Sequence, residues 1–177
     1  FMKKLTLTFL TLTICLGIAL AQNSKKDQKI IEDTAEAKAE FLEADPDMAS
    51  LFSSSYGYIT LPNVGKGGLG VGAASGNGVA YEKGSMIGFA SMKQLSIGFQ
   101  AGGQAYREVV FFEDEESFTR FKTGQIEMSA QVSAVAAPDG VSADAKYVDG
   151  VMVFTMAKGG LMYEASVGGQ QFKFRAD

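Results

Sequence analysis

The pattern of apolar and polar residues divides the chain into three stretches. Residues 5–20 are almost continuously apolar, and residues 23–43 carry apolar side chains at helical spacing in a charged background. From Tyr56 onward, apolar residues come in short runs separated by glycine, which is typical of strands and tight turns. We therefore expect helices near the N-terminus and an antiparallel sheet in the remainder of the chain.

The first stretch has the organisation of a signal peptide. Lys3 and Lys4 precede the apolar run, and Ala19 and Ala21 supply the small residues that a signal peptidase reads. The run is short and rich in threonine for a membrane span, which leaves an uncleaved anchor as the alternative. We expect cleavage after Ala21 and a mature protein that is periplasmic or secreted, with membrane association as an option.

The residues after the leader predict two helices. The first covers residues 23–43, and Asp45-Pro46 opens a second, short helix whose apolar face contains Met48 and Phe52. We assign residues 1–21 to the signal peptide, residues 22–54 to an N-terminal helical segment and residues 55–177 to a β-rich domain. Residues 22–177 are expected to fold as one unit.

The β-rich part contains many short strands and one helix. Acidic residues early and Lys122 late predict a helix over residues 114–122, with Gly124 as its stop. Strands are expected over residues 58–61, 79–81, 85–90, 94–100, 106–112, 128–136, 151–156, 161–167 and 172–174. The predicted class is α+β: N-terminal helices and one middle helix on a curved, glycine-rich antiparallel β-sheet, either a sandwich or a partly closed barrel.

Composition restricts the chemistry of the mature chain. There is no histidine, and Cys15 in the leader is the only cysteine. This excludes zinc sites built from histidine or cysteine, and catalysis that relies on a histidine base. We expect no metal and no cofactor. Paired catalytic carboxylates would have to come from Glu82, Glu108, Glu113, Asp114 and Glu164.

Nothing in the sequence brings two of these carboxylates together across a cleft. We therefore expect that the protein is not an enzyme and has no catalytic residues, with an enzyme that uses a carboxylate or a tyrosine as a remote alternative. Without the leader, 14 basic residues stand against 20 acidic ones, a net charge of −6. This acidic balance argues against nucleic-acid binding.

One glycine-rich motif resembles a nucleotide-binding sequence. Residues 65–70 match G-x-G-x-x-G after a predicted strand, but no helix follows and Gly72, Gly76 and Gly78 continue the run. A dinucleotide site needs that helix, because its N-terminus holds the pyrophosphate. We therefore expect no nucleotide ligand.

Cations beside glycine at predicted turns are the candidate binding residues. Backbone N–H groups of glycine-rich turns, with a lysine nearby, can hold phosphate head groups. For each residue taken alone, an ordinary exposed loop position is the alternative. The candidate lipid-binding residues are Gly65, Lys66, Gly67, Gly68, Lys83, Lys93, Arg107 and Lys158.

Several blocks of the chain resemble the SYLF domain family. The opening block is an aromatic and apolar strand, a proline and then Gly-Lys-Gly-Gly. The blocks are residues 56–68 (YGYITLPNVGKGG), 96–104, 109–112 with Phe118 and Phe121, and 158–161 with Gly168. The resemblance as a whole spans about residues 35 to 174. Residues 136–140 and the acidic first helix depart from the family pattern.

The resemblance implies a lipid-binding module. Eukaryotic members of this family bind phosphoinositides, and fungal members are associated with actin patches. Bacteria generally lack phosphoinositides, so we expect an anionic phospholipid of the bacterial envelope or a membrane surface as the ligand, with Lys66 as the first contact. The alternative is a structural or protein-interaction domain of the periplasm or outer membrane, which packs on an envelope protein and has no lipid ligand.

Overall fold

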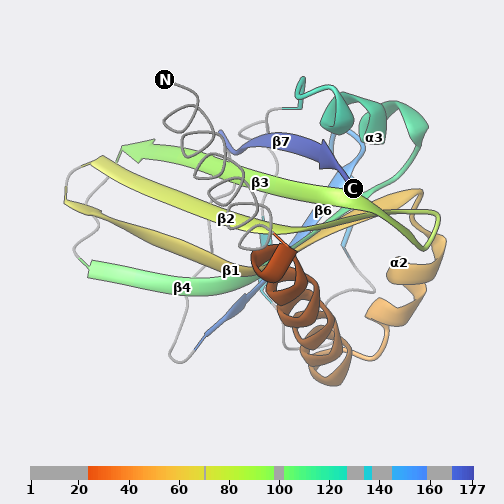
Figure 1. Ribbon diagram of the computed structural model, residues 1–177, viewed down its shortest axis with the longest axis horizontal. Helices are drawn as coiled ribbons and strands as arrows, with labels where there is room; N and C mark the ends of the chain where they lie inside the picture. The colour runs from red at the N-terminus through yellow and green to blue at the C-terminus, as the bar shows by residue number, and fades with distance from the viewer. Residues whose placement is uncertain (1–23, 70, 98–101, 127–133, 137–144, 159–168) are drawn as a thin grey trace, which may run out of the picture.

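The computed structural model describes residues 24–69, 71–97, 102–126, 134–136, 145–158 and 169–177 (Figure 1). A long N-terminal helix covers residues 24–44. The other elements are α2 (Met48–Ser54), β1 (Gly57–Leu69), β2 (Val71–Glu82), β3 (Ser85–Ile97), β4 (Gly102–Phe112), α3 (Glu115–Lys122), β5 (Ala134–Ala136), β6 (Val151–Ala157) and β7 (Gln171–Ala176).

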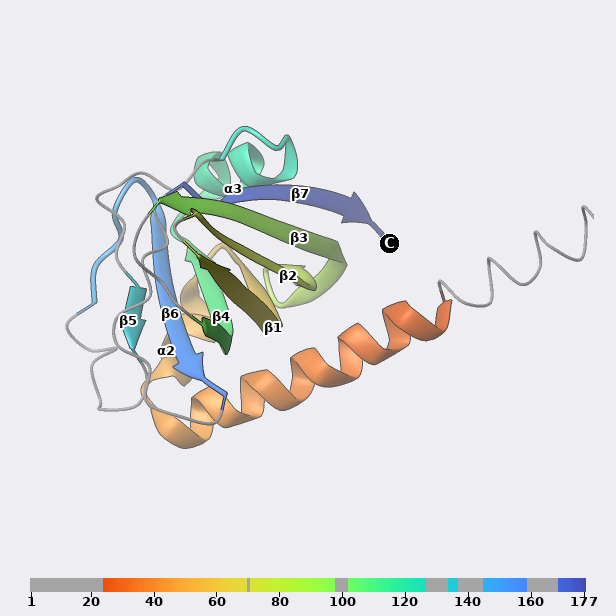
Figure 2. The same ribbon diagram turned by 90° about the vertical axis from the view of Figure 1, so that its left-hand side faces the viewer.

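The described strands form one sheet, in the order β5-β6-β4-β1-β2-β3-β7. Neighbours run antiparallel, except that the short β5 runs parallel to β6. The sheet is strongly curved and open, with β5 and β7 as its edges (Figure 2). The predicted α+β class, with helices on a curved antiparallel sheet, is confirmed. The sheet is one open layer and not a sandwich of two.

Both faces of the sheet are covered by helices. On the face called the helix face below, Phe111 of β4 packs in a cluster with Phe41 of the N-terminal helix and Phe52 of α2. On the opposite face, called the α3 face, Phe112 lies with its ring centroid 5.2 Å from that of Phe118. Successive strand residues point to opposite faces, so β4 contributes alternately to two hydrophobic cores.

The glycine-rich stretch, predicted as turns, is strand. Gly65 and Lys66 lie inside β1 and pair with residues of β2 on one side and β4 on the other. A strand with two neighbours has its backbone hydrogen bonds satisfied without any side chain, so glycine does not end it. The prediction of turns is also wrong for Lys93, which lies within β3, and for Arg107, which lies within β4.

The prediction that Pro62 ends the first strand is wrong as well. The pairing register shifts between Thr60 and Asn63 on the β2 side, and between Leu61 and Val64 on the β4 side. Such a bulge accommodates a proline, which has no N–H to donate, and lets the strand continue beyond it.

The three predicted helices are present. The N-terminal helix and α3 match their predicted ranges to within one residue, and α2 buries Met48 and Phe52. In the part of the chain that the structure describes, no helix is both long enough and apolar enough to cross a bilayer. The predicted signal peptide, the strand over residues 161–167 and most of the strand over residues 128–136 lie outside the described residues.

The helix α3 begins with a capping box. The backbone N–H of Ser117 donates to Asp114 Oδ1 at 2.8 Å. Asp114→Ala removes this cap and is expected to lower the free energy of unfolding by about 1 kcal/mol. Asp114→Asn keeps a capping oxygen and is expected to cost less than about 0.5 kcal/mol. Urea denaturation measures both losses, and equal losses would show that the cap does not stabilise the helix.

Candidate functional site

The structure spreads the predicted binding residues over the sheet. Lys66 is half-buried on the α3 face, beside its register partner Ala74. Gly65, Gly67 and Gly68 continue the strand around it, so they form no turn that could hold a phosphate.

Lys83 lies at the opposite end of the β1–β2 hairpin, in the turn before β3. Its φ is 50°, and its Nζ lies 4.7 Å from the centroid of the Tyr56 ring. The turn itself agrees with the sequence analysis. The distance along the sheet from Lys66 means that these two lysines do not form one site.

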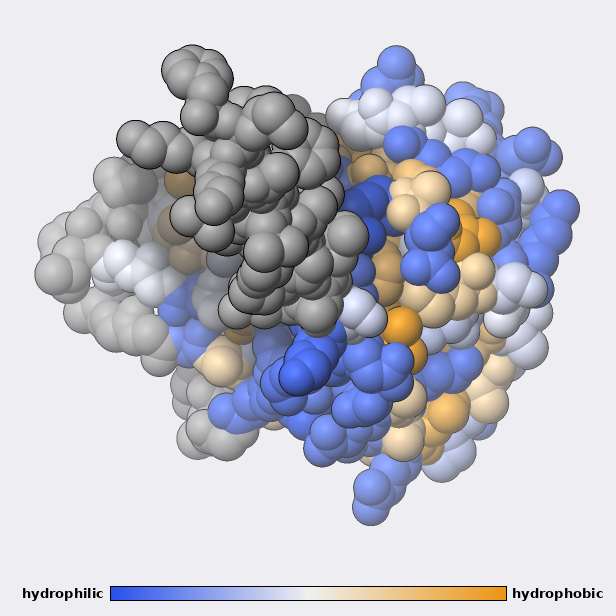
Figure 3. Space-filling model, viewed as in Figure 1, coloured by the Kyte–Doolittle hydropathy of each residue, from blue (hydrophilic) through white to orange (hydrophobic). Residues whose placement is uncertain are grey.

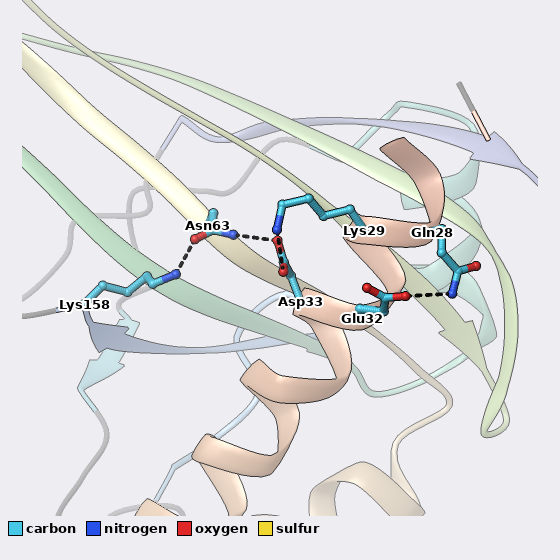
Figure 4. A network of polar contacts seen from close by, with 6 residues as sticks. All are labelled: Gln28, Lys29, Glu32, Asp33, Asn63 and Lys158. Carbon is cyan, nitrogen blue, oxygen red and sulfur yellow. Dashed lines mark hydrogen bonds and ion pairs between the residues drawn. The ribbon is translucent and has the colours of Figure 1, made fainter. Parts of the chain in front are cut away.

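Two further predicted cations are engaged on the helix face. Arg107 is buried and forms an ion pair with Glu40 of the N-terminal helix. Lys158 donates to Asn63 Oδ1, and Asn63 Nδ2 donates to Asp33 Oδ2 at 3.4 Å (Figure 4). Both cations therefore connect the sheet to the N-terminal helix. Lys93 differs from them because it is exposed.

Three adjoining cavities follow the β3–β7 ladder at the edge of the sheet. Their volumes are about 320, 360 and 500 Å³. Ser91 and Lys173 line both the first and the second cavity, and Lys93 and Gln171 line both the second and the third. These residues are register partners across the ladder. The cavities therefore form one groove, called the β3–β7 groove below.

The groove begins beneath the N-terminal helix. Lys26, Asp27 and Ile30 form the helix side of the first cavity, and Phe89 and Arg175 lie on the sheet side. Arg175 pairs with Asp27 at 2.8 Å, and its guanidinium lies 4.3 Å from the centroid of the Phe89 ring. The start of the helix is thus attached to the edge strand β7.

The groove has an excess of positive charge. Among the residues that the structure describes, its lining contains Lys26, Lys93, Lys173 and Arg175 against the single acid Asp27. Asp27 is bound to Arg175, whereas the three lysines form no ion pair within the described residues. A phosphate or carboxylate would therefore meet three uncompensated ammonium groups here.

The far end of the groove exposes an apolar side chain close to a cation. Leu95 lines the third cavity and is 79% exposed; it is the one large apolar residue so exposed in the described ranges. Lys93 lies two residues before it on the same strand. At the opposite end of the sheet, residues 113–116 are all acidic.

A buried carboxyl group lies on the α3 face. Glu108 is fully buried and accepts a hydrogen bond from Gln170 Nε2 at 2.9 Å. Burial raises the pKa of Glu108 to about 7, and the hydrogen bond from Gln170 offsets part of that rise. The hydroxyl of Thr155, its register partner on β6, has no hydrogen-bond partner in the described part of the molecule.

This buried acid has no access to a substrate from solution. Across the described ranges, no group of three His, Cys, Asp or Glu side chains could hold a metal ion. The arrangement that the surface offers is therefore one for binding an anion, through the cations of the β3–β7 groove.

The sequence analysis missed Lys26, Lys173 and Arg175. A signal for two of them was present, because Gln171, Lys173 and Arg175 alternate with Phe172 and Phe174 in β7. Such alternation places the polar residues on one face of a strand. What the sequence did not contain was the pairing of β7 with β3, which brings Lys173 beside Lys93.

Comparison with known proteins identifies the family of this chain. The family model described as "Ysc84: Las17-binding protein actin regulator" matches residues 93–177, which include Lys93 and all of β7. The chain is also similar to Beta cell expansion factor A of Aeromonas veronii, with 30% identity over 129 residues. That match covers 72% of this chain, which spans about half, 49%, of the relative. Through residues 93–177, the chain belongs to the SYLF (Ysc84) domain family.

Proposed function

We propose that this chain is a non-enzymatic module that binds anionic phospholipid at a membrane surface through the β3–β7 groove. The observation that carries the proposal is a line of lysines that have no carboxylate partner among the described residues and that ends beside the exposed Leu95. Family membership agrees with a lipid- or actin-patch-related domain.

In this proposal, the head group lies between Lys93 and Lys173. Lys93 pairs with Gln171, so Lys173 is its diagonal neighbour on the adjacent strand. Diagonal neighbours on one face lie about 7–8 Å apart, which lets two long lysine side chains reach one phosphate. Ser91 lies directly across from Lys173 and adds a hydroxyl donor.

Leu95 supplies an apolar contact beyond the head group. Moving a leucine side chain from water into an apolar environment contributes about 1.5–3 kcal/mol. A lysine adds about 1 kcal/mol near an anionic surface. Such a combination favours an interface between charged head groups and acyl chains over a fully aqueous polyanion.

The envelope of a bacterium is the proposed location, after cleavage of the leader at Ala21. A protein partner in the envelope is the second candidate function, because the family is described by a protein-binding activity. Binding to such a partner through an apolar surface would be insensitive to salt, in contrast to head-group binding.

Neutralising the groove is expected to weaken vesicle binding. Lys93→Gln with Lys173→Gln should raise the dissociation constant for phosphatidylglycerol vesicles about 10- to 30-fold, because two surface lysines contribute about 2 kcal/mol. Lys83→Gln with Lys146→Gln removes the same charge from exposed positions outside the groove and should have a small effect. Co-sedimentation measures both pairs, and equal weakening would contradict the assignment.

Lys66→Ala tests whether Lys66, which the sequence analysis gave as the first lipid contact, belongs to the binding site. Lys66 lies on the α3 face and does not itself line the groove, although its register partner Ala74 lines the third cavity. We expect this variant to bind anionic vesicles within about twofold of wild type. A loss as large as that of the Lys93 and Lys173 pair would move the binding site to the α3 face of β1.

A further inference from the structure

Acidic residues of the N-terminal helix contact the sheet at three points along the helix, and the middle one, Asp33, also pairs with Lys29 of the helix itself at 3.2 Å. Asp27 pairs with Arg175 at its start, and Glu40 pairs with Arg107 near its end. Between them, Asp33 accepts from Asn63, which in turn accepts from Lys158 (Figure 4). The helix therefore supplies carboxylates to a strip of the sheet that would otherwise be basic.

The two halves of this helix are held with different strength. In the second half, Thr34, Ala37 and Phe41 are buried to 1% or less, and Phe41 belongs to the core of the helix face. In the first half, residues 24–33, no side chain reaches that degree of burial. The first cavity of the groove, of about 320 Å³, lies directly beneath Lys26, Asp27 and Ile30.

The first half is thus attached mainly by polar contacts over incompletely filled space. Exposed ion pairs contribute little and are weakened by salt or by a competing anion. The surface that the helix exposes in Figure 3 is mostly hydrophilic, and its first half contains only two large apolar side chains, Ile30 and Ile31, which are half-buried, so lifting this half exposes little apolar surface. The anchored second half would act as the fixed end of such a movement.

We propose that the sheet face beneath residues 24–33 is a second anion-binding surface, which Asp27 and Asp33 occupy until an anionic lipid surface displaces them. The displacement would free Arg175 from Asp27 and the Nδ2 of Asn63 from Asp33, next to the Lys158 ammonium that Asn63 Oδ1 holds. Arg175 lines the same cavity as Lys173, so the freed surface is continuous with the β3–β7 groove. This inference rests on the proposed lipid-binding function. Residues 24–33 would act as a cover over part of the binding surface and would lower the affinity of the protein for anionic lipid.

A matched pair of variants tests the proposal in the full mature chain. Asp27→Asn with Asp33→Asn removes the two carboxylates of residues 24–33 that contact the sheet, and it leaves Glu40 unchanged. Glu36→Gln with Glu43→Gln removes two exposed carboxylates from the same helix and changes the net charge equally. Against phosphatidylglycerol vesicles, the first pair should bind about three- to tenfold more tightly than the second.

Hydrogen exchange supplies a second measurement. Added anionic vesicles should speed amide exchange in residues 24–33 of the wild type and leave residues 37–44 protected. The cover would be refuted if the two pairs of variants bound with equal affinity. It would also be refuted if wild type bound vesicles without a change of amide exchange in residues 24–33. Neither result would contradict the lipid-binding function. If neither wild type nor any variant binds, both proposals fail. Binding by the Asp27 and Asp33 pair alone would support the cover.

Discussion

Gly78→Ala is expected to unfold the protein or to leave it severely destabilised. A Cβ atom at Gly78 would lie 1.9 Å from the carbonyl oxygen of Thr60 and 2.7 Å from its carbonyl carbon. Both atoms are backbone at the β1 bulge, so neither can rotate away. A steric conflict of this kind belongs to the rare substitutions that cost more than about 4 kcal/mol.

Gly65→Ala is the matched control in the same hairpin. A Cβ atom at Gly65 would meet nothing within 4 Å. We expect this variant to stay within about 0.5 kcal/mol of wild type, as surface substitutions usually do. Urea denaturation followed by circular dichroism measures both. A Gly78→Ala protein as stable as the Gly65→Ala protein would mean that the bulge in β1 is not packed against β2 as described.

Glu108→Gln is expected to stabilise the protein at alkaline pH and to flatten its dependence on pH. The pKa of Glu108 is about 7 in the folded state, against 4.5 for an unperturbed glutamate. Between these values the folded state binds more protons than the unfolded state, so stability rises as pH falls from 8 to 4. The difference corresponds to about 3 kcal/mol at 1.36 kcal/mol per unit.

The effect of Glu108 is isolated by comparing two variants across that pH range. Glutamine at position 108 stays neutral and can still accept the hydrogen bond from Gln170. Glu113→Gln changes an exposed carboxylate and should follow the wild-type curve. If wild type and Glu108→Gln lost stability in parallel between pH 4 and pH 8, Glu108 would have an ordinary pKa, and its burial would be refuted.

The helices could be predicted from the sequence because their signals are local. Asp114 and the acids that follow it mark the start of α3, and Gly124 marks its end with a φ of 69°. The α+β class followed in the same way, from the change of hydrophobic period near Tyr56. A local signal of this kind does not depend on which distant segments become neighbours in the fold.

The ends of the strands were harder to predict because glycine occurs both in turns and inside the sheet. Around Gly84, with a φ of 81° and open space for a Cβ, glycine marks a turn as expected. At Gly78, it allows close approach of β2 to β1 inside the sheet. The sequence does not distinguish these two uses, and it therefore predicts turns over a stretch that is a continuous hairpin.

The candidate site could be predicted only in part, because it depends on which strands become neighbours. Lys93 was named because a turn was predicted there, although it lies in a strand. Arg107 was named on the same grounds, but the structure pairs it with Glu40, 67 residues away. Lys173 was missed because β7 pairs with β3 over a sequence separation that no local pattern encodes.

Vesicle co-sedimentation of the mature protein, starting at Gln22, tests the central claim most directly. Phosphatidylglycerol vesicles are compared with phosphatidylcholine vesicles at 0.1 M and at about 1 M salt, where the Debye length falls from about 10 Å to about 3 Å. We expect binding to phosphatidylglycerol at low salt, much weaker binding at high salt and little binding to phosphatidylcholine. Equal binding to both lipids at both salt concentrations, or no binding to either, would contradict the account.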